Sequence, residues 1–253
     1  MRIGIGVGVE YTKLGETFTP ASISDLKVWL KGDSGITLVG GEVDVWADQS
    51  GNGINLSAAA AINRPTISTR NSKNVVVFNG STKWLRNIGA GIAANVSGLT
   101  IIVAGASNSA TFSRQSQVTI GSGTGGVRAG IGWGWLDPAR LGRDAGGRRL
   151  NGDSFVGCGQ LAYNADWSNN SARFNYSAAI LQTYNNNVAT DSLNPFQTSG
   201  NTPNDGGDLY IGVGLVGVGR LLNGPIGEIL IYHKALTDSE LAQVQTYLAA
   251  RWA

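Results

Sequence analysis

The order of apolar and polar residues predicts a chain that is built mostly of β-strands. Short apolar runs, many alternating with polar residues or glycine, are separated by clusters of Gly, Asn, Asp and Ser. A period of two is typical of half-buried strands, and such clusters are typical of turns. The strands predicted in this way cover residues 2–9, 42–48, 74–78, 99–104, 158–163, 172–184, 208–213 and 224–232, with a hairpin turn at 185–187.

Two parts of the chain depart from this pattern. Residues 121–159 are rich in glycine and arginine, and we expect them to be mostly loop. The end of the chain predicts one helix, because Thr237 followed three residues later by Glu240 forms a capping box. Apolar residues then recur at helical spacing, at Leu241, Val244, Tyr247, Leu248 and Trp252. A long β domain closed by one packed helix is therefore expected.

The first residues carry a strict alternation of their own. Ile3, Ile5, Val7 and Val9 are each separated by a glycine, which predicts a strand with one apolar face. Such a strand would serve as an edge strand or as an arm that pairs with another subunit, and a poorly ordered terminus is the alternative. We assign residues 1–21 to this arm or edge strand and residues 22–253 to a single sandwich domain.

Composition narrows the classes of function. The 253 residues can form one all-β domain, and a net charge of +2 is too small to indicate nucleic acid as the main partner. No apolar run reaches the ~18 residues of a membrane-spanning helix, and the first residues do not resemble a signal peptide, so we expect synthesis in a cytoplasm and no membrane partner. Cys158 and His233 are the only residues of their kinds, which argues against disulfides, thiolate zinc sites and most catalytic triads.

Four segments in this order resemble a known superfamily. They are Leu-Lys-Val-Trp-Leu at 26–30, Val-Trp-Ala-Asp-Gln-Ser-Gly-Asn-Gly at 45–53, Arg-Pro-Thr at 64–66 with Val-Phe-Asn-Gly at 77–80, and residues 224–252. Their spacing is similar to the laminin-G-like branch of the concanavalin A-like lectin/glucanase superfamily over residues 22–252, although 105–160 does not align. The resemblance implies an all-β, concanavalin A-like jelly-roll sandwich of two antiparallel sheets with one C-terminal α-helix.

The glycine-rich start before such a domain is also similar to virion proteins of tailed bacteriophages. By that analogy we expect a non-enzymatic surface protein of the virion, such as a head decoration, fibre or tail-tip component, made in the host cytoplasm. Its expected partners are other capsid or tail proteins, further copies of itself in a homo-oligomer, and a host-surface glycan. The alternatives are a stand-alone carbohydrate-binding module or adhesin, and a polysaccharide hydrolase.

A cluster of tryptophan and arginine in the middle of the chain is the candidate ligand-binding site. Aromatic faces stack on sugar rings, and guanidinium groups bind hydroxyls or carboxylates. The alternative is that the tryptophans fill the core and the arginines are only solvated. Asp166 and Trp167, with Tyr163, repeat the pattern more weakly. The site residues expected to bind ligand are Trp133, Trp135, Asp137, Arg140, Arg143 and Arg148.

The acidic residues do not form a recognisable catalytic set. Glu42, Asp44, Trp46 and Asp48 would share one strand face, with neighbours ~7 Å apart, as carboxylates of inverting glycosidases are. Glucanases of the resembled superfamily carry a Glu-x-Asp-x-x-Glu strand, but here Ala47 stands in place of the second glutamate. We therefore assign no catalytic residue and expect a solvated strand face.

The remaining polar positions are read as structural. Glu228 lies within an apolar strand and would need a partner if buried, such as Arg64 or Arg220. The turns at 48–52 and 201–208 carry oxygen side chains that suit calcium, but neither has the spacing of the regular twelve-residue calcium loop. No metal site and no cofactor are assigned, with calcium as the alternative.

Overall fold

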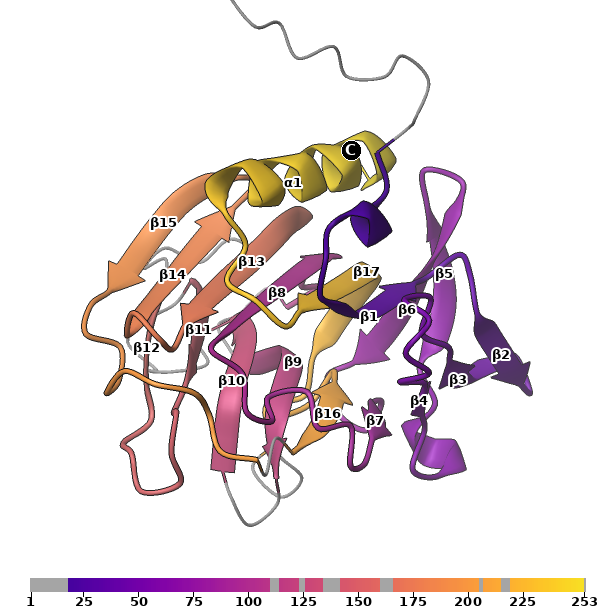
Figure 1. The fold of residues 1–253 in the computed structure, drawn as a ribbon. Coiled ribbons are helices and arrows are strands. Elements are labelled where there is room, and N and C mark those ends of the chain that lie inside the picture. The colour runs from indigo at the N-terminus through magenta and orange to yellow at the C-terminus, as the bar shows by residue number, and fades with distance from the viewer. Residues whose placement is uncertain are drawn as a thin grey trace, which may run out of the picture.

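The computed structural model describes residues 18–109, 114–122, 126–133, 142–159, 166–204, 207–214 and 219–252. Over these residues two antiparallel sheets face each other, and the helix α1 (Asp238–Trp252) lies across the outer face of one of them (Figure 1). The expected class, a jelly-roll-like sandwich of two antiparallel sheets with a C-terminal helix, is confirmed. No helix among the described residues has the length and the apolar character needed to cross a membrane.

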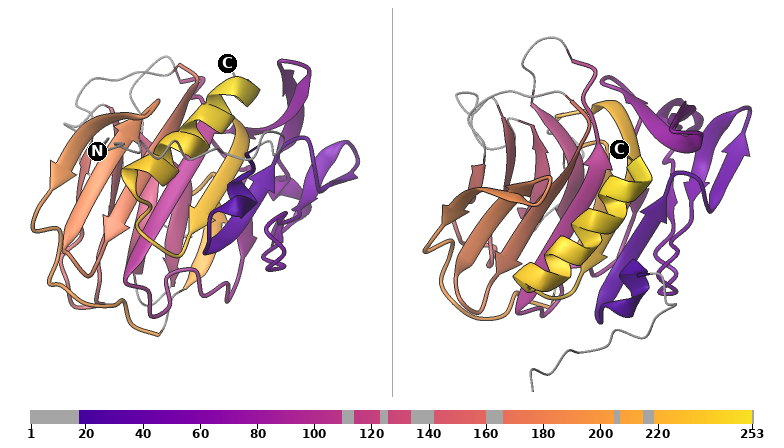
Figure 2. Two further views of the ribbon diagram at one scale, coloured as in Figure 1. Left: turned by 45° about the horizontal axis from the view of Figure 1, so that its top comes forward. Right: turned by 90° about the horizontal axis from the view of Figure 1, so that it is seen from above.

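The helix-covered sheet brings together strands from the whole length of the chain. Its hydrogen-bonded order is β15 (Val188–Leu193), β14 (Ile180–Asn185), β13 (Ser168–Asn175), β8 (Gly98–Gly105), β17 (Asn223–Tyr232), β6 (Lys73–Asn79) and β5 (Thr66–Arg70). In addition, β1 (Leu26–Lys31) pairs with the second half of β17. Figure 2 shows α1 lying over these strands.

The second sheet has nine strands and forms the other layer of the sandwich. Its order is β12 (Val156–Gly159), β11 (Arg143–Gly147), β10 (Gly126–Trp133), β9 (Gln115–Ser122), β16 (Asp208–Ile211), β7 (Leu85–Asn87), β4 (Leu56–Ser57), β3 (Glu42–Trp46) and β2 (Ile36–Val39). Two single-turn 3₁₀ helices, η1 (Pro20–Ser22) and η2 (Ala61–Asn63), lie outside the sheets.

The apolar residues form two cores. The larger lies between the sheets and contains fully buried aromatic side chains, among them Trp46, Phe78, Trp133 and Phe174. The smaller lies between α1 and the sheet beneath it, and its members include Leu230, Tyr232, Leu241, Val244, Leu248 and Trp252. The expected apolar face of the helix is thus confirmed, except that Tyr247 is only half-buried.

The start of α1 is fixed by the capping box that the sequence predicts. The Thr237 amide donates to Glu240 Oε2 at 2.9 Å, and the Glu240 amide donates to Thr237 Oγ1 at 3.2 Å. These bonds satisfy two amides that the first helical turn leaves unpaired.

The other end of α1 is tied to the sheet through Glu228, whose side chain is fully buried in β17. Its carboxylate accepts hydrogen bonds from Trp29 Nε1 at 2.6 Å, Trp252 Nε1 at 2.9 Å and the Tyr247 hydroxyl at 2.9 Å. Arg251 Nε lies 2.8 Å from the same carboxylate as an ion pair. The partner arginine is therefore Arg251, and neither of the two that the sequence suggested.

Those neighbours also keep the Tyr247 hydroxyl in its donor form. Burial, and after it the charge of Glu228, raises the pKa of Tyr247 well above its ordinary value of 10.0. A buried carboxylate is costly unless its lone pairs are filled, and here three donors and one cation fill them. We call this set the Glu228 clamp.

Residues 121–159 differ from the expected loop, because they contain the whole of β10, β11 and β12. Glycines conceal these strands in the sequence, yet close packing of the backbone requires some of them. A Cβ at Gly132 would overlap the carbonyl oxygen of Gln115, and one at Gly147 would overlap that of Arg128. The glycines therefore allow neighbouring strands to approach each other and do not mark loops.

The shared face expected for residues 42–48 is also absent. Strand β3 ends at Trp46, whose ring is fully buried in the core, and the β2–β3 pairing has an irregular register between Thr37 and Leu38. Glu42 and Asp44 are half-buried, and Asp48 lies beyond the strand in a turn. The irregular register breaks the simple alternation on which that expectation rested.

The Glu228 clamp predicts a large loss of stability when its charge is removed. Glu228→Gln keeps the shape of the side chain but leaves Arg251 without its buried partner, so the free energy of unfolding should fall by about 2–4 kcal/mol. Urea denaturation followed by tryptophan fluorescence measures this loss. The control is Asp33→Asn, which removes the more exposed partner of Arg251 and should cost under ~1 kcal/mol. Equal losses in the two variants would contradict the role of the clamp.

Candidate functional site

The residues expected to bind ligand are placed mostly in the interior. Trp133 ends β10 and is fully buried, and the Arg143 guanidinium lies over its ring at 5.4 Å from the ring centroid. Arg143 itself is buried at the start of β11. Arg148 is half-buried and donates to the Asn151 carbonyl at 3.3 Å. The other three residues of the expected set, Trp135, Asp137 and Arg140, lie outside the described residues.

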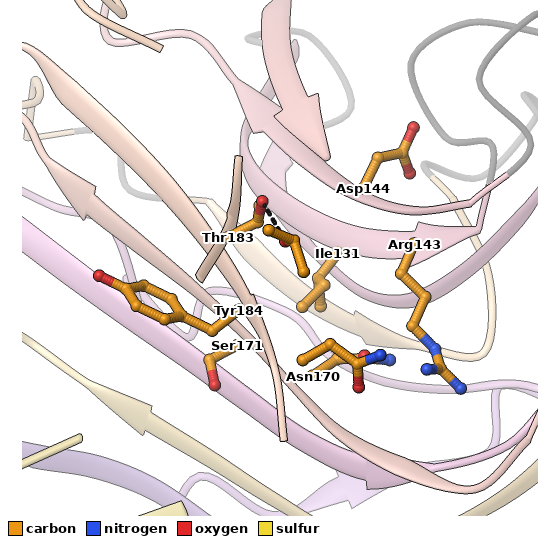
Figure 3. Close-up of a pocket in the computed structure, with 9 residues that line it drawn as sticks. Ile131, Arg143, Asp144, Asn170, Ser171, Thr183 and Tyr184 are labelled. Atoms are coloured by element: carbon orange, nitrogen blue, oxygen red, sulfur yellow. Dashed lines mark hydrogen bonds between the residues drawn. The ribbon is translucent and has the colours of Figure 1, made fainter. Parts of the chain in front are cut away.

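The space beside Arg143 is too small for a sugar. Figure 3 shows Arg143 and Asn170 directed into one gap between the sheets, whereas the Asp144 carboxylate points away from it. The volume of this gap is about 10 Å³, about the space of a single water molecule. Trp133 therefore lies in the core, which is the alternative that the sequence left open for the tryptophans, whereas Arg143 is buried and not solvated as that alternative expected.

A larger site lies on the outer face of the helix-covered sheet, beside α1. Three adjoining hollows of about 390, 230 and 230 Å³ share lining residues, and we call them together the transverse groove. The largest hollow shares Arg70 and Trp167 with the middle hollow. The middle hollow shares Asn169, Asn186 and Ala249 with the third, which we call the far hollow.

The wall of the groove is a compact group of aromatic and cationic side chains. The Arg70 guanidinium lies 4.6 Å from the centroid of the Trp167 ring, and Trp167 lies 5.6 Å from Trp252 between ring centroids. Arg70 Nε donates to the Trp252 carbonyl at 2.8 Å, which fixes the side chain against the end of α1. Trp167 is half-buried, so part of its indole ring remains accessible from the groove.

The floor and rim of the largest hollow differ in polarity. Its floor is apolar, formed by Val75, Val77, Ala106 and Pro225. Its rim carries hydrogen-bonding groups, namely Ser68, Thr69, Asn108 and Asp166, all of them exposed. A concave, mainly apolar surface with a few polar groups at its edge is the usual composition of a small-ligand site.

The far hollow is lined by amides and carries no charged residue among those described. Asn186 and Asn187 form the two-residue turn between β14 and β15 with φ of 48° and 64°, so the hairpin turn expected at 185–187 is confirmed. Asn186 Oδ1 accepts from the Asn169 amide at 2.9 Å, which joins this turn to the start of β13. Gln245 of α1 donates to the Asn169 carbonyl at 3.5 Å and closes the inner side.

The acidic residues on β3 and in the turn after it are held by cations or by the backbone and nearby hydroxyls. Glu42 pairs with Lys83 at 2.7 Å, and Asp44 pairs with Arg64 at 2.6 Å. Asp48 accepts hydrogen bonds from the amides of Ser50 and Ile54 and from the Ser50 hydroxyl within its own turn, and from the Trp29 amide of β1. These carboxylates therefore stabilise the fold locally.

In the two turns considered for calcium, protein donors form hydrogen bonds to the carboxylates of Asp48 and Asp208. The donors around Asp48 occupy the oxygens that a cation would need. Asp208 accepts from the Gly89 amide at 2.8 Å and from the Tyr210 hydroxyl at 2.9 Å, whereas Asp205 lies outside the described residues. The described part of the chain contains no group of three His, Cys, Asp or Glu side chains that could hold a metal ion.

Sequence reasoning pointed to only part of the groove. Asp166 and Trp167 were singled out as a weaker copy of the expected site, but Arg70, Asn169, Asn186 and Gln245 were not. Their signal is weak because they lie on separate elements that only the pairing of distant strands brings together. The one local signal was the asparagine-rich turn.

Comparison with known proteins supports the fold. No family model and no curated protein sequence matches the chain. Among solved structures, domain 4 of AbnA, an extracellular arabinanase from Geobacillus stearothermophilus solved in complex with arabinotriose, is similar with a TM-score of 0.60 at 14% identity. The match covers 87% of this chain and 98% of that domain.

Two toxin structures are also similar. The binding domain of Paraclostridial Mosquitocidal Protein 1 has a TM-score of 0.62 at 14% identity, over 90% of this chain and 53% of that one. A botulinum neurotoxin type C structure, whose title states that cell entry depends on two ganglioside molecules, has a TM-score of 0.55 at 11% identity, over 87% and 50%. The chain thus spans about half of each toxin structure. At these identities the likeness establishes a shared lectin-like β-sandwich fold.

The burial of Trp133 predicts that its loss damages the fold. Trp133→Ala would leave a large cavity between the sheets, and the free energy of unfolding should fall by about 3–5 kcal/mol. Urea denaturation measures the change. Trp84, which is half-buried, provides the control, and Trp84→Ala should cost clearly less. A stability equal to that of the unaltered protein would place the Trp133 ring outside the core.

Proposed function

We propose that the protein is a non-enzymatic glycan-binding module whose ligand lies in the transverse groove. The observation that carries the proposal is the composition of that groove: an apolar floor, an aromatic wall beside Arg70, and a rim of amides and hydroxyls. Sugars present apolar C–H faces and hydroxyl edges, so such a surface complements them. The arabinotriose and gangliosides named for two structural neighbours support the proposal by analogy of fold.

The distribution of carboxylates supports binding without catalysis. Glycoside hydrolysis requires two carboxylates on either side of one bond, about 5–9.5 Å apart. Among the described residues that line the groove, Asp166 is the only acidic one. Glu42 and Asp44 are ion-paired elsewhere, and Glu228 is enclosed by its clamp.

We also propose that this module is displayed on the surface of a tailed-phage virion as a homo-oligomer. The support is the resemblance of the glycine-rich start and the following domain to virion proteins. In that setting the glycan would belong to the host surface, and the first residues would join the module to the particle. A stand-alone adhesin that binds through the same groove is the second candidate, and the same groove observations favour it.

Glycan binding through the groove predicts a specific effect at Trp167. Trp167→Ala should weaken binding to the best glycan of an array by at least about tenfold, because the aromatic wall is lost. Isothermal titration measures the affinity of the purified protein. The matched control is Trp84→Ala, which also removes a half-buried tryptophan under an arginine, but on the second sheet. An array without binding, or equal weakening in both variants, would refute the proposal.

The virion proposal makes a separate prediction. Deleting residues 1–15 should leave the sandwich folded, because the described strands and both cores are formed by residues from Phe18 onward, but should prevent incorporation into particles. Circular dichroism checks the fold, and mass spectrometry of purified particles checks incorporation. Normal loading of the truncated chain would contradict a role for the first residues in attachment.

A further inference from the structure

The transverse groove crosses the helix-covered sheet from one side almost to the other. Apart from those on α1, its lining residues come from, or lie within a few residues of, six strands that are neighbours in the sheet: β14, β13, β8, β17, β6 and β5. These six strands are separated by five inter-strand spacings of ~4.8 Å, so the groove is ~24 Å long. That length is several times the width of one sugar ring.

The strand register brings lining residues of neighbouring strands to nearly the same level of the sheet, and we call this set the row. Ser168 of β13 pairs with Gly105 of β8, and the next residue, Ala106, lines the groove and donates its amide to the carbonyl of Pro225 in β17 at 3.0 Å. On the far side, Pro225 of β17 pairs with Val77 of β6. The strand residues that line the groove therefore lie at nearly one level of the sheet, and residues of α1 such as Ala249 and Trp252 line its other side.

Both ends of this row are open over the described residues. At the β5 end, Ser68 and Thr69 are exposed, and at the β14–β15 end, Asn187 and Thr246 are exposed. Recognition of a terminal sugar requires a closed end that meets the last unit, whereas an open track accepts a chain that continues past it.

The two ends also differ in charge. The far hollow is lined by Asn169, Asn186, Asn187, Gln245, Thr246 and Ala249, none of them charged. Charge enters only with Arg70, which extends from β5 to the junction of two hollows, and with Asp166 in the largest hollow. A repeated acidic chain would meet one cation and one carboxylate along the whole track, so the lining favours a mainly uncharged ligand.

From these observations we infer that the groove binds an internal stretch of a linear, mainly uncharged polysaccharide, with several sugar units in contact at once. This inference rests on the proposed glycan-binding function and adds the length and chemical class of the ligand. The central contacts are made at Trp167 and Arg70, and the outer units are held at Thr69 on one side and Asn187 on the other.

The first test is the dependence of affinity on ligand length. Linear malto-, cello- and arabino-oligosaccharides of one to six units are titrated into the full chain, with sialyllactose as an acidic probe. We expect affinity for one of the neutral series to rise at least about tenfold between the disaccharide and the hexasaccharide. A series in which the disaccharide binds as tightly as the hexasaccharide, or tight binding of sialyllactose alone, would overturn the inference.

The second test uses variants at the ends of the groove. Asn187→Gly removes the side chain and suits the positive φ of that turn, and Thr69→Ala removes the hydroxyl at the other end. Each should weaken hexasaccharide binding by about threefold to tenfold and leave disaccharide binding unchanged. The matched controls are Asn95→Gly, also exposed and at positive φ, and Thr66→Ala, on the same strand as Thr69; neither lines the groove.

The outcomes separate this inference from the proposed function. Binding that Trp167→Ala weakens but that depends neither on ligand length nor on the end variants would keep the glycan-binding function and refute the extended ligand. Failure of every oligosaccharide to bind would refute both. Loss of long-ligand affinity in the control variants as well would also refute the assignment of the ends.

Discussion

The position of α1 depends on one buried carboxylate. Glu228 binds Trp29 in β1, and it also binds Tyr247, Arg251 and Trp252 in the last turns of the helix. A buried charge in an apolar strand is tolerable only when such partners surround it, so removing a partner from the clamp would leave Glu228 uncompensated and destabilise the fold. Because its partners lie 199 residues and about 20 residues away in sequence, it joins the beginning of the domain to its end.

The shape of the groove depends on this clamp. Trp252 is fixed by Glu228 on one side, and its carbonyl accepts a hydrogen bond from Arg70 on the other. Arg70 in turn lies over Trp167, whose ring packs against Trp252. The aromatic wall is thus supported by packing and hydrogen bonds behind it, which is the condition for a binding surface that is formed before its ligand arrives.

The sequence allowed the architecture to be predicted much better than the site. Alternation, the capping box at Thr237 and the asparagine turn are local patterns, and local patterns survive in a single sequence. Strands β10 and β11 were concealed because close contacts between backbones select glycine there, which removes the apolar signal. The groove could not be read at all as a unit, since its residues meet only through the order β14–β13–β8–β17–β6–β5. Trp133 shows the converse error of reading a core tryptophan as a surface one.

The same distribution of charge explains why this sandwich suits binding better than chemistry. Most of the acidic side chains considered at the sequence level have structural partners. Asp44 and Glu42 of β3 form ion pairs with Arg64 and Lys83, Asp48 accepts hydrogen bonds that fix a turn, and Glu228 fixes the helix to the sheet. What remains on the concave outer surface beside α1 is mainly amide, hydroxyl, indole and apolar surface, with a single guanidinium at its centre. These groups bind neutral hydroxylated chains through many weak contacts. Affinity on such a surface grows with the length of ligand in contact, which suits a module that holds a polymer without cutting it.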